Sequence, residues 1–274
     1  MFGELLTRVR ERSPLIHCIT NYVTANDCAN LLLACGASPI MADSPDEVGD
    51  VVSLCGGLLL NTGTMNRDRL SAMLLAGERA NALGIPVVLD PVGAGSSRAR
   101  TEAVLTILRT VRVSAIRSNL SELRAILGTA APTRGVDSDP KEKITDPVQT
   151  VGEMKRLSER LGAVIAVTGE TDLVADREKV YKIKNGSPFL RLVTGAGCQL
   201  SALTAAFLAA NPEKPTEAVA AAVCMMGVCG EIAEGRMSGA DGNASYRNYV
   251  IDAAYRLTET ELNGRARARE EGIA

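Results

Sequence analysis

The residues best suited to chemistry lie in a glycine-rich turn around position 195. The chain reads Thr194-Gly195-Ala196-Gly197-Cys198 there, and a long run of small apolar residues follows. That run predicts a helix, whose first backbone N–H groups have no partner within it and whose dipole adds partial positive charge. A turn without bulky side chains lets a phosphate approach those amides. The pattern fits an anion site beside Cys198, although an ordinary loop before a helix explains the turn equally well.

A second glycine-rich turn follows a carboxylate. Asp90 closes an apolar β-branched run, and Gly93 and Gly95 come soon after it. Mg²⁺ prefers carboxylate oxygens and bound water, so Asp90 is a candidate for holding Mg²⁺ or its water shell near a triphosphate. The alternative is that Asp90 caps the following turn. We favour the metal role.

A third polar cluster surrounds the start of another expected helix. Arg117, Asn119 and Glu122 follow a short apolar run. A functional interpretation gives Arg117 a nucleotide phosphate and Glu122 a water-mediated role at Mg²⁺. The structural alternative is that Asn119 or Ser121 caps the helix and Glu122 complements the dipole.

Two further residues have functional and structural interpretations. Thr168 ends an expected strand, where its hydroxyl can donate to a phosphate or simply lie in a turn between strands. His17 is the only histidine, so a pair of histidine metal ligands is excluded. A serine triad lacks the G-x-S-x-G nucleophile elbow. We therefore expect His17 to have a structural or pocket-lining role.

Composition narrows the class of protein. A net charge of -2 gives no electrostatic case for binding nucleic acid or an anionic membrane. The 7 cysteines are scattered without C-x-x-C spacing, which favours a reducing compartment over a disulfide framework or a zinc site. The N-terminus is amphipathic and unlike a signal peptide. The apolar run 218–228 is bounded closely by Glu217 and Glu231, so we expect a buried helix, and a cytoplasmic location.

The elements that must position these residues alternate along the chain. Helix-length segments separate most of the short β-branched runs, which predicts a mostly parallel α/β sheet flanked by helices. Strands are expected at 16–20, 38–41, 58–61, 87–91, 115–118, 164–168 and 179–183. Helices are expected at 26–35, 67–83, 100–111, 121–127 and 148–161.

The last third has a different composition. From residue 197 to about 262 it is rich in Ala and Met and predicts three helices, with breaks at 211–212 and 239–242. The stretch 128–147 is irregular, and the charged tail 263–274 is expected to fray. No linker stands out, so we predict a single domain over residues 1–274.

The candidate residues converge once the strands are arranged in parallel. Ligands of open α/β sheets bind outside the carboxyl ends of the strands. Asp90, Arg117, Asn119 and Thr168 all lie at or just after such ends, and the Gly195 turn can join them.

The segments together resemble the hydroxyethylthiazole kinases of the ribokinase-like fold group. They occur in the family's order and span about residue 3 to residue 262. The matching text is IHCITNYV (16–23), GASPIMA (36–42), NTGT (61–64), LDPVGAG (89–95), RSNLSE (117–122), GVDS (135–138), VTGE (167–170) and TGAGC (194–198). Most ribokinase-like kinases carry Asp as general base where this chain and the thiazole kinases carry Cys198. Ser118 departs from the family, which commonly has Gly there.

The resemblance implies an activity and a role for each matched residue. The activity is ATP-dependent phosphorylation of 4-methyl-5-(2-hydroxyethyl)thiazole, which yields its phosphate for thiamine salvage, with Mg²⁺ as cofactor. The catalytic turn is Gly195, Ala196, Gly197 and Cys198; the thiazole contacts are Met41, Gly195, Asn21 and Val23; the ATP contacts are Arg117, Thr168 and Asn119; the metal residues are Asp90 and Glu122. The family is trimeric with active sites between subunits, so residues 16–23 are expected to contribute across an interface.

The proton acceptor is the open question in this scheme. A thiol is a poorer base than a carboxylate near neutral pH unless a helix terminus lowers its pKa. Phosphoryl transfer passes through a loose transition state and needs little prior deprotonation. Our hypothesis is that Cys198 orients the alcohol and is not an obligatory base.

Two rival functions stay open at this point. One is another alcohol kinase on the same fold, acting on hydroxymethylpyrimidine or pyridoxal, against which Cys198 and residues 16–23 argue. The other is a non-catalytic protein that binds nucleotide or thiazole, against which the intact Asp90, Arg117, Asn119 and Glu122 argue.

Overall fold

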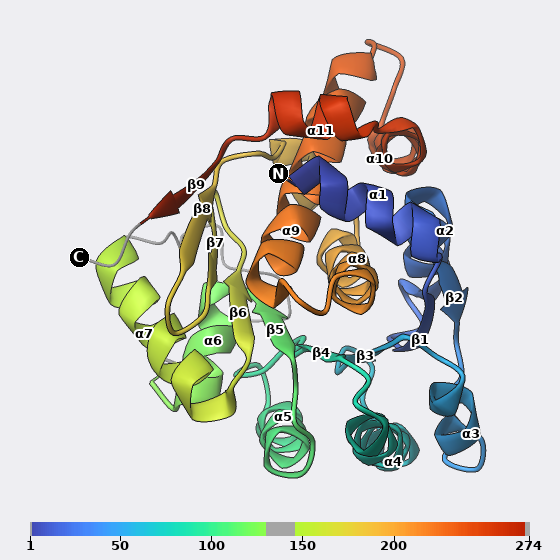
Figure 1. Cartoon of the computed structure of the whole chain (residues 1–274), viewed down its shortest axis with the longest axis vertical. Coiled ribbons are helices and arrows are strands. Elements are labelled where there is room, and N and C mark those ends of the chain that lie inside the picture. The colour runs from blue at the N-terminus through green and yellow to red at the C-terminus, as the bar shows by residue number, and fades with distance from the viewer. Residues whose placement is uncertain (1, 130–145, 272–274) are drawn as a thin grey trace.

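Nine strands form one sheet in the computed structural model, which describes residues 2–129 and 146–271 (Figure 1). The order is β2-β1-β3-β4-β5-β6-β7-β8-β9; pairing is parallel from β2 to β6 and antiparallel from β6 to β9. The strands are β1 Leu15–Ile19, β2 Ser38–Ile40, β3 Gly57–Asn61, β4 Val87–Asp90, β5 Ala115–Ser118, β6 Val164–Val167, β7 Asp172–Ala175, β8 Val180–Ile183 and β9 Ala268–Glu271. The predicted mostly parallel α/β sheet is confirmed.

Helices connect the parallel strands and fill the last third. They are α1 Phe2–Arg12, α2 Ala25–Cys35, α3 Val48–Ser53, α4 Arg67–Leu83, α5 Arg98–Thr110, α6 Leu120–Leu127, α7 Pro147–Leu161, α8 Ala196–Ala210, α9 Pro215–Arg236, α10 Asn243–Arg256 and α11 Glu259–Arg265, with the 3₁₀ helix η1 Pro188–Leu192. Gly84 and Gly162 end α4 and α7 in the left-handed conformation, as their positions after helical patterns indicate.

The sheet separates two apolar layers. One layer contains α1, α2, α8, α9 and α10, and the other contains α3 to α7 (Figure 1). Successive strand residues face opposite layers, so Val88 packs toward α8 whereas Leu89 packs toward the α4 side. By the same alternation Asp90 faces α8. Helix α8 packs against β1, β3 and β4, which brings its N-terminus to the carboxyl ends of these strands.

Helix α9 is long and apolar enough to cross a membrane by length and composition. In the structure, however, 78% of its most apolar window is buried inside the protein. It packs against α8, α10 and the strands β6 to β8. The expectation that this segment is a buried helix is confirmed.

The C-terminal tail differs from the sequence-based expectation of fraying. The first residues of the 263–274 tail belong to the last turn of α11, and residues 268–271 form β9, which pairs antiparallel with β8. Glu270 accepts a hydrogen bond from the Tyr181 hydroxyl at 2.8 Å, and Asn185 accepts one from the Arg267 backbone N–H at 2.6 Å. These pairings order a segment whose composition alone suggests disorder.

The helical last third contains one more helix than expected. The breaks after α8 and α9 are confirmed, but α10 ends at Arg256 and a separate α11 follows. Thr258 caps α11 by accepting a hydrogen bond from the Glu261 backbone N–H at 3.1 Å. Most of the predicted irregular stretch 128–147 lies outside the described residues.

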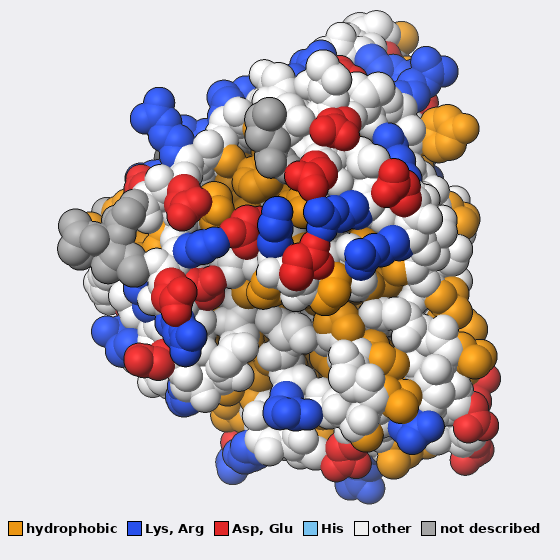
Figure 2. Space-filling model, in the orientation of Figure 1, with side chains coloured by type: hydrophobic (Ala, Val, Ile, Leu, Met, Phe, Trp, Pro, Cys, Tyr) orange, Lys and Arg blue, Asp and Glu red, His pale blue; other side chains and the backbone are white. Residues whose placement is uncertain are grey.

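Charge is distributed evenly over the visible surface. On the face that Figure 2 shows, Lys and Arg side chains lie among Asp and Glu side chains without a broad area of one sign. This agrees with the near-neutral net charge of -2. The face offers no basic stripe of the kind that follows a nucleic acid backbone.

Candidate active site

The sequence-predicted residues meet at the carboxyl edge of the parallel strands. Asn21 follows β1, Met41 follows β2, Asp90 ends β4, Asn119 follows β5 and Thr168 follows β6. Asn61, to which the sequence analysis gave no role, ends β3 at the same edge. The strand register places Asn61 directly opposite Asp90. We call this set of strand ends, together with the Gly195 turn at the start of α8, the rim.

Asp90 is completely buried and accepts two hydrogen bonds at one oxygen. Its Oδ2 accepts from Asn61 Nδ2 at 2.8 Å and from Ser201 Oγ of α8 at 2.8 Å. Its Oδ1 has no hydrogen-bond partner among the described residues, and Arg117 Nη1 lies 3.7 Å away from it. Burial raises the pKa of Asp90, and the Arg117 cation opposes that shift. The turn-capping alternative for Asp90 is not what the structure shows.

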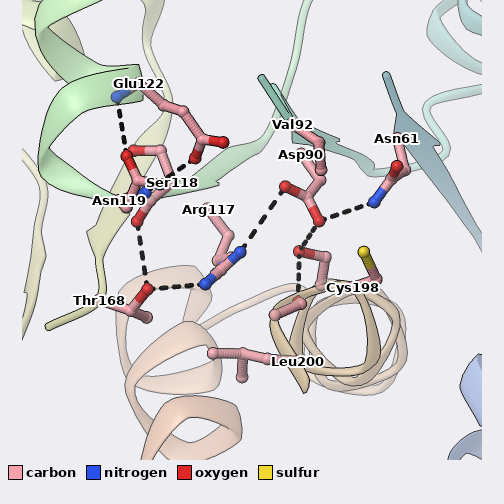
Figure 3. A network of polar contacts seen from close by, with 12 residues as sticks. Asn61, Asp90, Val92, Arg117, Ser118, Asn119, Glu122, Thr168, Cys198 and Leu200 are labelled. Carbon is pink, nitrogen blue, oxygen red and sulfur yellow. Dashed lines mark hydrogen bonds and ion pairs between the residues drawn. The ribbon is translucent and has the colours of Figure 1, made fainter. Parts of the chain in front are cut away.

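Arg117 bridges two strand ends (Figure 3). Its guanidinium faces Asp90 on one side and donates from Nη2 to Thr168 Oγ1 at 2.7 Å on the other. The planar guanidinium suits simultaneous contacts of this kind. Thr168 also begins the turn between β6 and β7, where the Gly169 N–H donates to Asp172 Oδ1 at 2.9 Å. The turn interpretation of Thr168 is therefore correct, and its hydroxyl lies beside Arg117 as well.

Glu122 and Asn119 form a capping box at the start of α6. Asn119 Oδ1 accepts from the Glu122 N–H at 2.8 Å, and Glu122 Oε2 accepts from the Asn119 N–H at 3.0 Å. Glu122 Oε1 also accepts from the Gly93 N–H at 3.0 Å, which ties the glycine-rich turn after β4 to the start of α6. Burial, and then the nearby Asp90 carboxylate, raise the pKa of Glu122 to about 7. The structural alternative for both residues is thus confirmed, and it keeps Glu122 beside Asp90.

The Gly195 turn needs both of its glycines. Gly195 caps α8 with φ of +83°, and a Cβ there would lie 2.3 Å from Thr24 Cγ2. A Cβ at Gly197 would lie 2.5 Å from Arg117 Nη1, so the missing side chain makes room for the guanidinium. Among the residues that the structure describes, no side chain caps α8, so its first-turn amides stay available to a ligand, as the sequence pattern predicts.

Cys198 connects to Asp90 through two asparagines. Asn21 Nδ2 donates to Cys198 Sγ at 3.2 Å and to Asn61 Oδ1 at 3.1 Å, and Asn61 then donates to Asp90. Thr24 fixes the orientation of the Asn21 amide, because its N–H and its hydroxyl both donate to Asn21 Oδ1. Burial, and then Asp90, raise the pKa of the Cys198 thiol. The sulfur is therefore held as a thiol at neutral pH.

Two residues of this network carry no role in the sequence analysis. Asn61 hydrogen-bonds to Asn21, Asp90 and the Gly63 N–H, and Ser201 supplies the second donor to Asp90. Asn61 ends a fully buried strand, the same position that singled out Asp90, so the sequence held a signal for it. The sequence holds no such signal for Ser201, because a serine in a helix of small residues gains a role only when that helix packs against the sheet.

The remaining candidates differ in exposure. Met41 and Val23 are 38% and 57% exposed, so their side chains reach the surface beside the rim. Ser118 is fully buried, and its hydroxyl has no hydrogen-bond partner among the described residues. His17 is fully buried with Nε2 2.7 Å from the Ala42 carbonyl, and burial lowers its pKa. The structural role expected for His17 is confirmed.

The arrangement combines a fixed cation, two buried carboxylates and an uncapped helix terminus. Within residues 2–129 and 146–271 no three His, Cys, Asp or Glu side chains gather as a metal cage. Mg²⁺ is usually held by only one or two carboxylates together with substrate phosphates and water, so the carboxylate pair is the donor set to expect. The rim is thus suited to a phosphate-rich ligand.

Known proteins resemble the chain along almost its whole length. The model of the hydroxyethylthiazole kinase family matches residues 6–260. A hydroxyethylthiazole kinase of Clostridium acetobutylicum is 48% identical over 97% of this chain and 98% of the relative. The solved structure of a hydroxyethylthiazole kinase protein from Pyrococcus horikoshii superposes with a TM-score of 0.87 at 35% identity, covering 98% of both chains.

A more distant structure shares the fold alone. The pyridoxal kinase of Staphylococcus aureus in complex with AMP-PCP has a TM-score of 0.61 at 16% identity, covering 94% of this chain and 98% of that one. Both the ribokinase-like fold and the resemblance read from the motifs are therefore confirmed. With the family model spanning residues 6–260 and the rim assembled as described, the chain belongs to the hydroxyethylthiazole kinase family.

Proposed function

We propose that the rim is where this kinase transfers the γ-phosphoryl group of ATP to the primary alcohol of 4-methyl-5-(2-hydroxyethyl)thiazole. The observation that carries the assignment is the position of Arg117, between Asp90 and Thr168 and against the start of α8. A fixed cation and unpaired helix amides stabilise charge on a transferring phosphoryl group. The product is the thiazole phosphate used in thiamine salvage.

The nucleotide lies on the β5 and β6 side of the rim. Arg117 and Thr168 contact its phosphates, because the guanidinium and the hydroxyl are already paired at 2.7 Å and need no rearrangement. Asn119 uses Oδ1 to cap α6, so any contact it makes with ATP comes from its amide nitrogen. The open amides of Gly195, Ala196, Gly197 and Cys198 receive the transferred group.

Asp90 and Glu122 fit a Mg²⁺ ion that accompanies the nucleotide. Asp90 Oδ1 is a buried carboxylate oxygen without a hydrogen-bond donor among the described residues, which is the kind of atom a hard cation satisfies. Glu122 already accepts from two backbone amides, so it acts through a bound water. The ion supplies charge neutralisation on the phosphate oxygens.

The thiazole lies on the β1 and β2 side. Met41 and Gly195 contact it through backbone groups, while Asn21 and Val23 border it. Asn21 supports this position, since its amide is oriented by Thr24 and reaches the Cys198 sulfur. These residues offer neutral polar groups and apolar side chains, which suit an uncharged heteroaromatic alcohol.

In the transfer step, the alcohol oxygen forms a bond to the γ-phosphorus while the bond between that phosphorus and the bridging oxygen of ADP breaks. The alcohol proton leaves as the new P–O bond forms. Cys198 orients the alcohol and is not an obligatory base, and the raised pKa of its thiol supports this role. Positioning and charge stabilisation carry most of the catalysis.

The active unit is a homotrimer in the cytoplasm, with residues of a second copy completing each thiazole pocket. Tyr22 and Val23 support the assembly, because both are large apolar side chains that stand 75% and 57% exposed beside the rim. Light scattering on the purified protein tests the mass. A charged substitution, Val23→Asp, should dissociate the trimer and abolish turnover together.

The first test is product formation. Purified protein is incubated with ATP, Mg²⁺ and the hydroxyethyl thiazole, with hydroxymethylpyrimidine and pyridoxal in parallel, and products are identified by mass spectrometry. Phosphate on the thiazole alone is the expected result. Phosphate only on another alcohol would retain the site and overturn the substrate. No product from folded protein that still binds ligand would favour a non-catalytic binder.

The role of Cys198 is tested separately. If the thiol only orients the alcohol, Cys198→Ser and Cys198→Ala should retain measurable turnover. The orienting role is wrong if Cys198→Ala is folded but inactive and Cys198→Asp does not restore activity. Circular dichroism melting of each variant establishes that the fold is intact.

A further inference from the structure

One arginine outside the rim contacts all three segments that leave β1, β2 and β3. Arg69 Nη1 donates to the Thr20 carbonyl at 2.9 Å and to Thr64 Oγ1 at 2.8 Å, and Arg69 Nη2 pairs with Asp43 Oδ2 at 2.6 Å. Thr20, Asp43 and Thr64 follow three strands that are neighbours in the order β2-β1-β3. A single guanidinium thus fastens three adjacent strand ends.

The position of Arg69 within its helix is otherwise unfavourable. Arg69 lies in the first turn of α4, where its N–H donates to the N-cap residue Asn66 at 2.9 Å. A cation near a helix N-terminus opposes the helix dipole, which favours anions there. The side chain is nevertheless only 13% exposed, because it folds back onto the strand ends. Helix stability therefore does not explain the arginine, whereas the three contacts do.

His17 contacts the segment that follows β2, residues 41–43, from its buried side. His17 Nε2 lies 2.7 Å from the Ala42 carbonyl, and His17 is fully buried on β1. Ala42 sits between Met41 and Asp43, so the short segment 41–43 is fixed by the imidazole on its buried side and by Arg69 on its outer side. Segment 41–43 has no strand pairing of its own.

The residues next to the three contacts include two that the proposed function places at the thiazole, Asn21 and Met41. Asn21 follows Thr20, Met41 precedes the 42–43 pair, and Gly63 precedes Thr64. A Cβ on Gly63 would lie 2.9 Å from Asn21 Cβ, so these segments approach as closely as their side chains allow. A shift of any one segment would move Asn21, and with it the hydrogen bond to Cys198 at 3.2 Å.

We infer that Arg69 is a positioning residue for the thiazole alcohol. It sets the relative placement of Asn21, Met41 and Gly63 without touching substrate, and its own contacts are to Thr20, Asp43 and Thr64, not to Asp90, Arg117 or Thr168. The inference rests on the proposed function, which assigns the alcohol to the β1 and β2 side. Small displacements of positioning groups cost rate because the reacting atoms must meet in a narrow geometry.

The test compares two arginines of the same helix. Arg69→Met removes all three contacts, whereas Arg79→Met is the matched control, because Arg79 of α4 donates from Nε to Ser53 Oγ at 2.9 Å, remote from the rim. KM and kcat are measured separately for the thiazole and for ATP. We expect Arg69→Met to raise the thiazole KM by about 10-fold or more while the KM for ATP stays at the wild-type value. Arg79→Met should match wild type in both.

Two conservative variants separate positioning from charge. Arg69→Lys keeps the charge but cannot span three acceptors, so its KM for the thiazole should lie between the values of Arg69→Met and wild type. Asp43→Asn keeps an acceptor oxygen and both other contacts of Arg69, so it should stay close to wild type. Full recovery by Arg69→Lys would overturn the bridging role, because the charge alone would then suffice.

Hydrogen exchange gives a readout independent of turnover. In Arg69→Met we expect faster amide exchange in residues 20–24 and 41–44 and unchanged exchange in residues 117–122. Unchanged exchange in the first two segments, or an equal rise in the KM of both substrates, would overturn the inference. If wild-type protein makes no thiazole phosphate, the proposed function fails, while the exchange experiment still decides whether Arg69 fastens the three strand ends.

Discussion

The two halves of the rim are built from opposite kinds of groups. The half at β4, β5 and β6 uses charged side chains, and Asp90, Arg117 and Glu122 already pair with one another or with backbone amides. The half at β1, β2 and β3 presents neutral amides, backbone groups and apolar side chains, and its charged residues Asp43 and Arg69 pair with each other at the strand ends. Charge set in place before a ligand arrives suits a triphosphate, and a neutral surface suits an uncharged alcohol.

The halves also differ in how complete they are within one chain. Asp90 and Glu122 are buried and their oxygens are mostly satisfied, whereas Met41, Tyr22 and Val23 are exposed. The charged half therefore tolerates little change, because moving one member leaves a buried charge without its partner. The neutral half has more freedom, and its geometry depends on outside supports such as Arg69 and His17.

The largest effect should come from filling the space beside Arg117. In Gly197→Ala the added Cβ would fall 2.5 Å from Arg117 Nη1, so the guanidinium must leave Asp90 and Thr168. We expect kcat to fall by about 100-fold or more, the scale seen when one transition-state donor is lost. Steady-state kinetics measure it.

Gly235→Ala on α9 is the matched control, because nothing lies within 4 Å of a Cβ there. It should keep wild-type kcat. If Gly197→Ala folds and keeps wild-type kinetics, the charged half tolerates substitution as well as the neutral half does. The difference inferred from burial would then be wrong.

A smaller effect should follow from removing the acceptor of Arg117. Thr168→Val deletes the oxygen that accepts from Arg117 Nη2 at 2.7 Å while keeping the side-chain shape. Hydrogen bonds to charged groups contribute about 1.5–3 kcal/mol, so the KM for ATP should rise by about 10-fold and the thiazole KM should not change. Thr106→Val is the control, since Thr106 accepts from Arg109 at 3.1 Å on the exposed face of α5. A rise in the KM for the thiazole, with no rise in the KM for ATP, would mean that Thr168 does not serve the nucleotide side of the rim.

The second donor to Asp90 should matter less. Ser201→Ala removes the hydrogen bond of 2.8 Å to Asp90 Oδ2, but Asn61 still donates to the same oxygen. We expect kcat to fall by about 3-fold, less than the roughly 1.5–3 kcal/mol of a hydrogen bond to a charged group, because Asn61 continues to satisfy the same oxygen. Ser53→Ala on α3, whose hydroxyl donates to the Gly49 carbonyl at 2.7 Å, is the control and should be silent in kinetics. A loss as large as that of Gly197→Ala would contradict this ranking.

Sequence patterns predicted the parallel sheet closely, for a physical reason. Buried β-branched runs and helical caps are local signals, and the bounds of β1 to β6 and β8 fall within one residue of the expected ranges. Strands β7 and β9 and helices α1 and α3 are not among the expected ranges. The segment Ala268–Glu271 reads AREE, a charged sequence with no strand pattern, and it is a strand only because β8 offers an edge for it to pair with.

The site residues divide in the same way, into those that a local sequence pattern indicates and those that depend on how distant elements pack. Asp90, Arg117 and Thr168 were found because polar residues at strand ends face a common edge. Asn61 had the same signal without being assigned a role. Ser201 and Arg69 could not be found this way, because each acts across space from a helix whose docking no local pattern specifies. Asn119 and Glu122 carried two interpretations at once, and the capping box confirms the structural one.

The smallest expected effect is on stability and concerns the support of the neutral half. Burial lowers the pKa of His17 below its ordinary value of 6.5, so the folded protein binds this proton less readily than the unfolded chain does. The stabilisation by neutral His17 is therefore present above pH 6.5 and is lost as pH falls below it. One proton of linkage gives a slope of at most about 1.4 kcal/mol per pH unit.

Buried carboxylates change the free energy of unfolding with pH in the opposite direction. The contribution of His17 must therefore be isolated by comparing wild type with a variant of that residue. Glu122 and Asp172 have pKa values raised to about 7, and they contribute stability at low pH that is lost as pH rises through 7. His17→Gln keeps a donor near the Ala42 carbonyl but does not titrate. The free energy of unfolding from urea melts should converge between wild type and His17→Gln as pH falls from 7 to 5, because only wild type loses the His17 contribution. Parallel curves over that range would mean that His17 is not held neutral, and that the neutral half is supported from its outer side alone.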